Sequence, residues 1–404
     1  MSFKRLAAAA FIVVLAVACN STVQAPAPEI IIASDFPSIA EAVPSMQDAI
    51  QLAVAENPKL RGYRLGYVPF DDSLGGAPWT QKGMQNLKRM FADPRVLGMV
   101  GPFNSYVTIE EIPRASAENF VMLSPTATNI CLTLAPFCDS QIEAAHANAP
   151  VNFFRIAPPD PAQGTAMAHF AGQQHIKLVA AINMWNTSTQ SGGDEYIAEF
   201  ARELRFQGGD LVRTEESRNP NHDFTNFLTH AKQAGAEAIY AVGDVAGGIC
   251  DIRAQMGSNF KYLLLTDGAT TDSDCLKSPA SVATFGTAGS VDATLSSDPH
   301  VKSIVKAFQK AYPRAPIGDY TFAAYDCAQI LIAAIGRAID ANHGGVPTRL
   351  EVLKQVASGE FDGGATGSYK FLPSGDAVSP TMSIWGVKDN HWYYIDKVDA
   401  SASS

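Results

Sequence analysis

The chain has 404 residues, of which 47% are hydrophobic and 17% charged, and its formal net charge is −10. This composition is that of a folded globular protein and excludes an intrinsically disordered chain. The acidic balance argues against nucleic acids and anionic lipid surfaces as partners. The length is enough for two lobes with separate hydrophobic cores.

The first 28 residues carry the features of an exported protein. Lys4 and Arg5 precede an apolar run over residues 6–18, which is too short for a membrane-spanning helix of ~20 residues and is typical of a signal peptide. Residues 15–19 (LAVAC) also resemble the lipobox of bacterial lipoproteins, in which the cysteine becomes the first mature residue and carries lipid. We therefore expect a signal peptide at 1–18, lipidation of Cys19, a polar tether at 19–28 and an extracytoplasmic protein held at a membrane. The alternative is a plain signal peptide with an incidental cysteine.

Strand-like apolar runs alternate with helical patterns along the chain. Strands are expected at 29–34, 64–70, 96–101, 120–124, 179–184, 236–242, 262–266, 369–371 and 382–387. Helices are expected at 41–56, 82–91, 161–174, 194–206, 224–234, 246–256, 301–311 and 322–341. This order predicts an α/β fold with two doubly wound parallel sheets, each covered by helices on both faces.

The stretch 153–159 (FFRIAPP) is expected to cross between the two lobes. We assign residues 29–157 and 292–365 to the first lobe and residues 158–291 and 366–398 to the second, with three crossings forming a hinge. Ligands of open α/β sheets bind beyond the carboxyl ends of the strands. The loops that follow strands, facing a cleft between the lobes, are therefore where a site is expected.

Five cysteines follow Cys19 along the chain, and none has the CxxC spacing of zinc or redox sites. In an oxidising compartment the two near pairs, Cys131 with Cys138 and Cys250 with Cys275, predict two disulfides. Other pairings stay open at this point. Cys327 lies in an apolar helical run and is expected to be a buried free thiol.

No catalytic motif is present in the sequence. It contains no GxSxG, HExxH or GxxxxGK[ST] pattern, and its eight histidines do not pair at metal-ligand spacing. We therefore expect a protein that is not an enzyme and that carries neither a cofactor nor a metal.

Two segments at predicted strand ends carry polar groups suited to binding. In the first, residues 100–105 (VGPFNS), Ser105 lies near the start of the next helix, where backbone N–H groups and the helix dipole favour a carboxylate. The alternative is that Ser105 is an ordinary helix N-cap. In the second, residues 122–129 (MLSPTATN), proline stiffens a turn that presents three hydroxyls and free carbonyls. The alternative is a turn whose hydroxyls bond their own backbone.

These two segments give the motifs GPxxS and SPxAT, some twenty residues apart. Together with Asp71-Asp72 after a strand, Phe154-Arg155, a strand ending at Asp267 and the sequence Ala324-Tyr325-Asp326, they resemble the leucine/isoleucine/valine-binding protein family. These are type I periplasmic solute-binding proteins of ABC transporters. The resemblance implies two hinged lobes, a small-molecule ligand such as an amino acid, and a permease and ATPase complex as partner.

The resemblance also implies roles for individual residues. Ser105 and Thr128 would bind a ligand carboxylate, and the carbonyl of Thr126 would accept from the ligand ammonium. Asp267 stands where the family usually has a glutamate that binds the ammonium by charge. Asp244 would assist Asp267 or replace an aromatic residue.

The chain departs from the family pattern where aromatic residues usually line the pocket. The loop after the first strand of the second lobe has Trp185 and a glycine-bearing stretch at 190–193, the loop after residue 242 has Gly243 and Asp244, and no aromatic residue stands near Ala42. A more polar amino acid, an amide or another small nitrogenous solute is therefore an alternative to a leucine-like ligand. Two further alternatives are the ligand-sensing component of a receptor and a lipoprotein that regulates by protein contact.

Overall fold

The computed structural model describes residues 29–40, 42–75, 77–133, 140–184, 193–219, 221–270, 273–276, 282–378 and 381–400. The predicted signal peptide, Cys19 and its tether, Cys138 and Trp185 lie outside these ranges.

The first part of the chain builds a sheet with the strand order β2-β3-β1-β6-β7-β8. Its strands are parallel except for β2, which pairs antiparallel with β3. The elements up to this crossing are β1 (Glu29–Asp35), α1 (Val43–Glu56), β2 (Lys59–Leu60), β3 (Tyr63–Phe70), β4 (Ser73–Leu74), β5 (Ala77–Pro78), α2 (Thr80–Ala92), β6 (Val96–Val100), α3 (Ser105–Ala117), β7 (Val121–Ser124), η1 (Ile130–Leu132), α4 (Ser140–Asn148) and β8 (Phe153–Arg155).

The middle of the chain builds a second sheet with the order β10-β9-β11-β12-β13-β16-β17. Its elements are α5 (Asp160–Gln173), β9 (Leu178–Asn183), α6 (Gly193–Phe206), β10 (Asp210–Glu216), α7 (Thr225–Gln233), β11 (Ala238–Val242), η2 (Val245–Gly247), α8 (Asp251–Met256), β12 (Tyr262–Leu265), η3 (Asp274–Leu276) and β13 (Ala283–Ala288), joined from the end of the chain by β16 (Thr381–Lys388) and β17 (His391–Asp399). The sheet is parallel from β10 to β13, as predicted, and β16 and β17 add an antiparallel edge.

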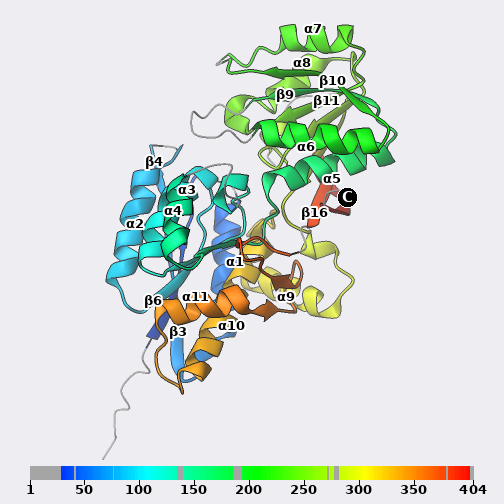
Figure 1. Cartoon of the computed structure of the whole chain (residues 1–404). Helices are drawn as coiled ribbons and strands as arrows, with labels where there is room; N and C mark the ends of the chain where they lie inside the picture. The colour runs from blue at the N-terminus through cyan, green and yellow to red at the C-terminus, as the bar shows by residue number, and fades with distance from the viewer. Residues whose placement is uncertain are drawn as a thin grey trace, which may run out of the picture.

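Between β13 and β16 the chain returns to the first lobe. This return comprises η4 (Ala293–Leu295), α9 (Pro299–Ala311), α10 (Thr321–Ala341), α11 (Arg349–Ser358), β14 (Glu360–Phe361) and β15 (Tyr369–Lys370). Figure 1 shows α9, α10 and α11 beside the N-terminal elements of the lower lobe, while β16 lies with the upper lobe. The predicted α/β class with two lobes is confirmed.

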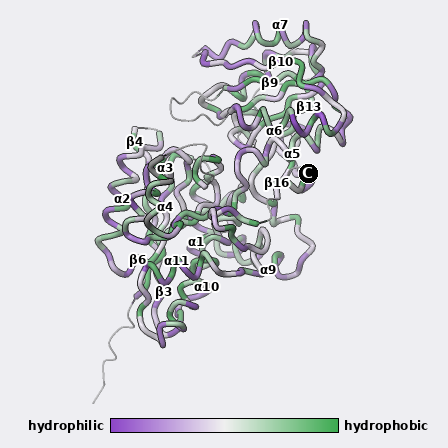
Figure 2. Tube along the Cα trace, in the orientation of Figure 1, coloured by the Kyte–Doolittle hydropathy of each residue, from purple (hydrophilic) through white to green (hydrophobic). Residues whose placement is uncertain are grey.

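Each sheet has a hydrophobic core on both faces, as the predicted doubly wound arrangement requires. In the first lobe, one core gathers residues of α1, α9, α10 and α11, and the other gathers residues of α2, α3 and α4. In the second lobe, α5 and α6 cover one face, and α7 and α8 cover the other. Hydrophobic and hydrophilic residues alternate along the outer helices (Figure 2), as expected for helices with one buried face.

The boundary predicted at residue 366 differs from the structure. Phe371 belongs to the core of the first lobe, and Asp376 forms an ion pair there with Arg155. The segment that contains Phe371 and Asp376 therefore belongs to the first lobe, whereas β16 belongs to the second. The sequence places an apolar tyrosine-containing strand at 369–371 but does not say which sheet it joins.

The helix predicted at 246–256 is also shorter than expected. It is divided into η2 and α8, because Gly248 adopts a φ of +90° between them. This is a left-handed conformation that glycine adopts without steric cost.

α10 has the length and composition of a membrane span, but 83% of its most apolar window is buried inside the structure. It packs against α1 and α11 in the core of the first lobe. Burial of this kind identifies it as a core helix.

Candidate ligand-binding site

A cavity of about 650 Å³ lies between the two lobes. All five residues predicted to bind a ligand line it. The first lobe contributes Ser105, Thr126 and Thr128, and the second contributes Asp244 and Asp267. They are far apart in the sequence but converge because each follows the carboxyl end of a parallel strand. The volume is in the range of small-molecule sites.

The two predicted loops of the first lobe are bonded to each other. The hydroxyl of Ser124 donates to the carbonyl of Pro102 at 2.7 Å, and that of Thr126 donates to the carbonyl of Phe103 at 2.8 Å. Ser124 Oγ also accepts from the amide of Ala127 at 2.9 Å. Ser124 thus bonds its own turn, as the alternative for this segment proposed, but both hydroxyls also donate to the other loop and so hold the two loops together.

Ser105 is not the N-cap of α3. The N-cap is Asn104, whose side chain makes no capping bond, and Ser105 is the first helical residue. Its Oγ accepts from the amide of Asn129 at 3.2 Å, and its own proton bonds to no described residue. This hydroxyl, at the positive end of the helix dipole, is therefore placed to donate to an anionic group in the cavity.

The carbonyl of Thr126 differs from those that follow it. The carbonyls of Ala127 and Asn129 accept from Arg155, and that of Thr128 accepts from the amide of Asp160. Within the described part of the chain the carbonyl of Thr126 accepts no such bond. A ligand ammonium could satisfy it, which agrees with the role that the sequence predicts.

Arg155 fixes this loop from inside the first lobe. Its side chain is fully buried, and its Nε donates to Asp376 at 2.6 Å. Its guanidinium also donates to Thr133 Oγ1 and to the carbonyl of Asn129, each at 2.7 Å. Guanidinium presents several donors in a fixed plane, which allows one side chain to hold several acceptors.

Asp267 lies at the end of β12 in the wall of the second lobe. Tyr320, from the first lobe, donates to its Oδ2 at 3.0 Å, and its own amide donates to Gln163 Oε1 at 3.0 Å. Burial raises the pKa of Asp267, and hydrogen bonds from Gln163 and Tyr320 lower it in part. A ligand cation at this carboxylate would favour its ionised form.

A second buried carboxylate, Asp160, stands close to Asp267. Tyr196 donates to its Oδ1 at 2.5 Å. Burial raises the pKa of Asp160 to about 7, against hydrogen bonds from Thr128 and Tyr196, and the charge of Asp267 adds to the rise. The Thr128 hydroxyl is thus shared between this carboxylate and any group in the cavity.

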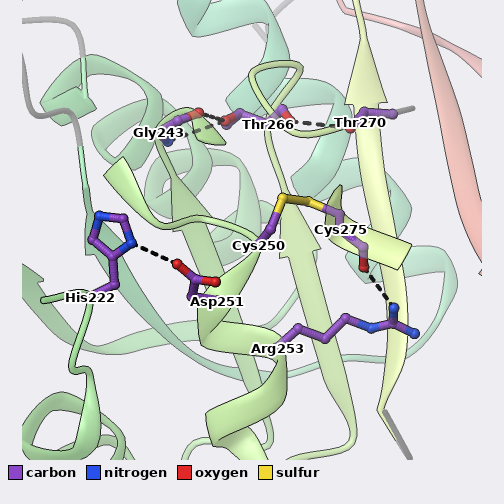
Figure 3. Close-up of a disulfide and its surroundings, with 8 residues drawn as sticks. All are labelled: His222, Gly243, Cys250, Asp251, Arg253, Thr266, Thr270 and Cys275. Atoms are coloured by element: carbon purple, nitrogen blue, oxygen red, sulfur yellow. Dashed lines mark hydrogen bonds and ion pairs between the residues drawn. A yellow bond between two sulfur atoms is a disulfide. The ribbon is translucent and has the colours of Figure 1, made fainter. Parts of the chain in front are cut away.

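Asp244 follows β11, the strand beside β12. Its Oδ1 accepts from the amide of Gly247 at 2.8 Å, which makes it the N-cap of η2. The hydroxyl of Thr266 donates to the carbonyl of Gly243 at 3.2 Å (Figure 3). Gly268 packs directly against the Gly243 carbonyl, where a Cβ would clash. The loops that carry Asp244 and Asp267 are therefore held together at a fixed spacing.

The sequence matches a family model described as a periplasmic binding protein over residues 37–391. The chain belongs to the periplasmic binding protein family. This is a family of binding proteins and not of enzymes, and membership gives an extracytoplasmic location. No curated protein matches the sequence.

Solved structures with the same fold include several transporter-associated proteins. A leucine-binding protein from Thermotoga maritima is 22% identical, with a TM-score of 0.73, over 92% of this chain and 99% of its own. An ABC transporter substrate-binding protein from Desulfitobacterium hafniense in complex with leucine is 18% identical, with a TM-score of 0.73, over 91% and 100%. A solute-binding protein from Rhodopseudomonas palustris in complex with benzoate is 18% identical, with a TM-score of 0.69, over 93% and 97%. At these identities the likeness shows the fold.

This periplasmic binding protein has aromatic residues in its cavity that the sequence did not reveal. Those in the lining are Phe103, Tyr106, Tyr196, Tyr320, Trp385 and Trp392. Trp385 and Trp392 come from the β16–β17 hairpin, whose position against the cavity depends on the last crossing. Asp160 was also missed, although it directly follows the predicted crossing at 153–159, where a hinge residue would meet the cleft.

The disulfide predicted between Cys250 and Cys275 is present (Figure 3). It joins the start of α8 to η3, and Arg253 donates to the carbonyl of Cys275 at 2.8 Å. Cys131 is disulfide-bonded, and its predicted partner Cys138 lies outside the described residues. Cys327 is a buried free thiol, as predicted.

Proposed function

We propose that this protein is the solute-binding lipoprotein of an ABC transporter and that it captures a small zwitterion, an amino acid, between its lobes. The observation that carries the proposal is the arrangement of the cavity. Hydroxyl and helix-end donors lie on the wall of the first lobe, and three of the four lining aspartates, Asp160, Asp244 and Asp267, lie on the wall of the second.

This arrangement has the polarity that a buried zwitterion needs. Ser105 offers a donor for a carboxylate, while Asp267 and the carbonyl of Thr126 offer acceptors for an ammonium. A zwitterion taken out of water without such partners would lose several kcal/mol of binding free energy. The lining satisfies both ends of the ligand at once.

Closure of the lobes would complete the site. The ligand contacts both walls, so it binds the closed form better than the open form and shifts the equilibrium between them. The closed form presents a surface that a permease can distinguish from that of the empty protein. A lipid on Cys19 would keep the protein at the membrane that holds the permease.

A receptor component that senses amides, which would use the same cavity, is the second candidate. A regulatory lipoprotein that acts by protein contact would not need a cavity with donors on one side and acids on the other. The lining thus favours ligand capture over regulation by contact.

The proposal is tested by calorimetry on the purified Cys19→Ser protein after a thermal-shift screen of amino acids, amides and benzoate. A ligand at 100 times its Kd should stabilise the protein by ~2.7 kcal/mol. Asp267→Asn should weaken amino-acid binding by ~2 kcal/mol or more, because the ammonium loses its counter-charge. Ser105→Ala should cost only ~1–1.5 kcal/mol, because backbone donors of α3 remain.

Ser303→Ala, an exposed serine of α9, is the control and should leave the affinity unchanged. If a zwitterionic ligand binds Asp267→Asn and Ser105→Ala as tightly as the parent protein, the proposed site is wrong.

A further inference from the structure

The cavity contains more carboxyl groups than the single ammonium of a neutral amino acid would pair with. Four aspartates line it, namely Asp160, Asp244, Asp267 and Asp319. None of its described lining residues is a lysine, arginine or histidine. A zwitterion has no net charge and needs a single counter-charge for its ammonium. Closing the lobes over such a ligand would bury several carboxyl groups around one ammonium, which is unfavourable for each of them that is ionised.

The acids of the second lobe fall into two groups. Asp160 and Asp267 interact with each other by charge and receive hydrogen bonds from Tyr196 and Tyr320, respectively. These two carboxylates share a hydrogen-bonded environment and mark one region of the cavity.

Asp244 belongs to a different region. Burial raises the pKa of Tyr106 to about 12, and the next contributions come from the charges of Asp72 and Asp244. Tyr106 is the second residue of α3, on the opposite lobe, and its hydroxyl donates to the carbonyl of Pro78 at 3.3 Å. Asp244 and Tyr106 therefore both line the cavity, from opposite lobes.

The position of Asp244 is fixed by its surroundings. The amide of Gly247 holds one of its oxygens at 2.8 Å, and the bond between Thr266 and Gly243 holds its strand end beside that of Asp267. Preorganised carboxylates of this kind discriminate ligands by charge, because little rearrangement is needed on binding.

The remaining lining suits a chain that ends in a cation. Ile39, Ala42 and Ile317 provide apolar surface, and Phe103, Tyr106, Trp385 and Trp392 provide aromatic rings. The face of an aromatic ring attracts ammonium and guanidinium groups. Apolar surface, aromatic rings and a carboxylate together match a methylene chain with a charged end.

We propose that Asp244 recognises a second cationic group and that the ligand is an amino acid whose side chain ends in an ammonium or guanidinium. This inference rests on the proposed function: Asp267 binds the α-ammonium, and Asp244 binds the charge at the far end of the side chain. Asp244, which follows β11 where an aromatic residue is usual in the family, would then set the ligand specificity of this protein.

The test compares lysine with norleucine, which has the same carbon chain without the terminal amine, by calorimetry on the Cys19→Ser protein. Arginine and ornithine extend the series. We expect lysine or one of these relatives to bind at least tenfold more tightly than norleucine. Asp244→Asn should remove that preference by weakening the binding of the cationic ligand. Asparagine is chosen because its amide oxygen can still accept from Gly247.

Asp292→Asn is the matched control. Asp292 also caps a 3-10 helix, η4, by accepting from the amide of Thr294 at 2.9 Å, and it lies outside the interlobe cavity. It should preserve the preference for the cationic ligand.

Three outcomes would overturn the inference. If norleucine or leucine binds as tightly as every cationic ligand, the inferred contact with a second cationic group is wrong, but the proposed function still stands. A preference that persists in Asp244→Asn would show that Asp244 is not its source. If no amino acid of either kind binds at millimolar concentration, the proposed function fails as well.

Discussion

Among single residues, the most unusual is a buried glutamate that takes no part in the proposed site. Glu111 of α3 is fully buried, and neither of its carboxylate oxygens has a hydrogen-bond partner among the described residues. Burial raises its pKa, and the nearby charges of Asp35 and Asp72 raise it further. Burial and the charge of Asp71 also raise the pKa of Asp72, to about 7.

Because of these carboxyl groups, we expect the free energy of unfolding to fall as the pH rises. Their pKa values are higher in the folded than in the unfolded chain, so the folded protein binds more protons between those values. Their contribution to stability is present below the ordinary carboxyl pKa of about 4 and is lost as the pH rises through the raised pKa values, of which that of Asp72 is about 7. Glu111→Gln cannot ionise, so it should raise the free energy of unfolding at pH 8 and flatten this dependence. Urea unfolding from pH 5 to 8 measures both.

Glu110→Gln is the control for this prediction, because Glu110 is the exposed neighbour on the same helix. It should leave the pH dependence unchanged. An equal slope in Glu111→Gln and the parent protein would show that Glu111 does not contribute.

The residues of the site were predictable to different degrees. Ser105 could be singled out because it follows a recognisable apolar strand and lies near a helix start, whereas Thr128 and Asp267 were assigned through the resemblance to the family. Asp160 could not be found in this way, because it begins α5 and meets the cavity only through the crossing between lobes. The role of Thr126 Oγ1 in the turn depends on a contact with Phe103, which is more than twenty residues away in the sequence.

Among the strands, those with a clear apolar pattern in the sequence were predicted, and those without one were not. Strands β1, β6 and β7 have mostly buried apolar runs, and they were predicted within a few residues. β10 and β17 were not predicted. Most residues of β10 are exposed or half-buried, and it lies at the edge of its sheet, so its sequence lacks the apolar pattern on which the prediction relied.

The ion pair of Arg155 and Asp376 connects two elements that sequence analysis assigned to different lobes. It joins β8 to the segment before β16, and both side chains are almost completely buried. Removing one partner leaves a buried charge without compensation. Asp376→Asn should therefore lower the free energy of unfolding by ~3 kcal/mol or more in chemical denaturation.

Asp340→Asn provides the comparison. Asp340 pairs with Arg61 at 2.8 Å, but both side chains are more than half exposed. Exposed pairs contribute ~0–1 kcal/mol, so this variant should be nearly neutral. Equal losses in the two variants would contradict the special role assigned to the buried pair. Because Arg155 also holds the carbonyls of Ala127 and Asn129, Asp376→Asn should also weaken ligand binding.

For the molecule as a whole, the direction of β1 determines where an anchor would attach. β1 runs from Glu29 to Asp35, and the residues that follow it, including Ile39 and Ala40, line the cavity. Glu29 therefore lies at the opposite edge of the sheet, where it pairs with Arg95 at 2.6 Å. A tether that ends there enters the first lobe on the side away from the ligand. Ten residues, 19–28, span at most about 35 Å.

This geometry predicts that anchoring and ligand binding are separable. Cys19→Ser should move the protein from the membrane fraction to the soluble fraction, while ligand affinity stays within about twofold of that of the lipidated protein in detergent, because the tether joins the lobe at the far edge of its sheet. Fractionation, mass spectrometry of the N-terminal peptide and calorimetry measure these outcomes. Thr22→Ser changes the tether but keeps the cysteine, so it should remain with the membrane. A parent protein that is already soluble and carries no lipid would exclude the anchor. A large loss of affinity in Cys19→Ser would mean that the tether reaches the cavity, against the direction in which β1 runs.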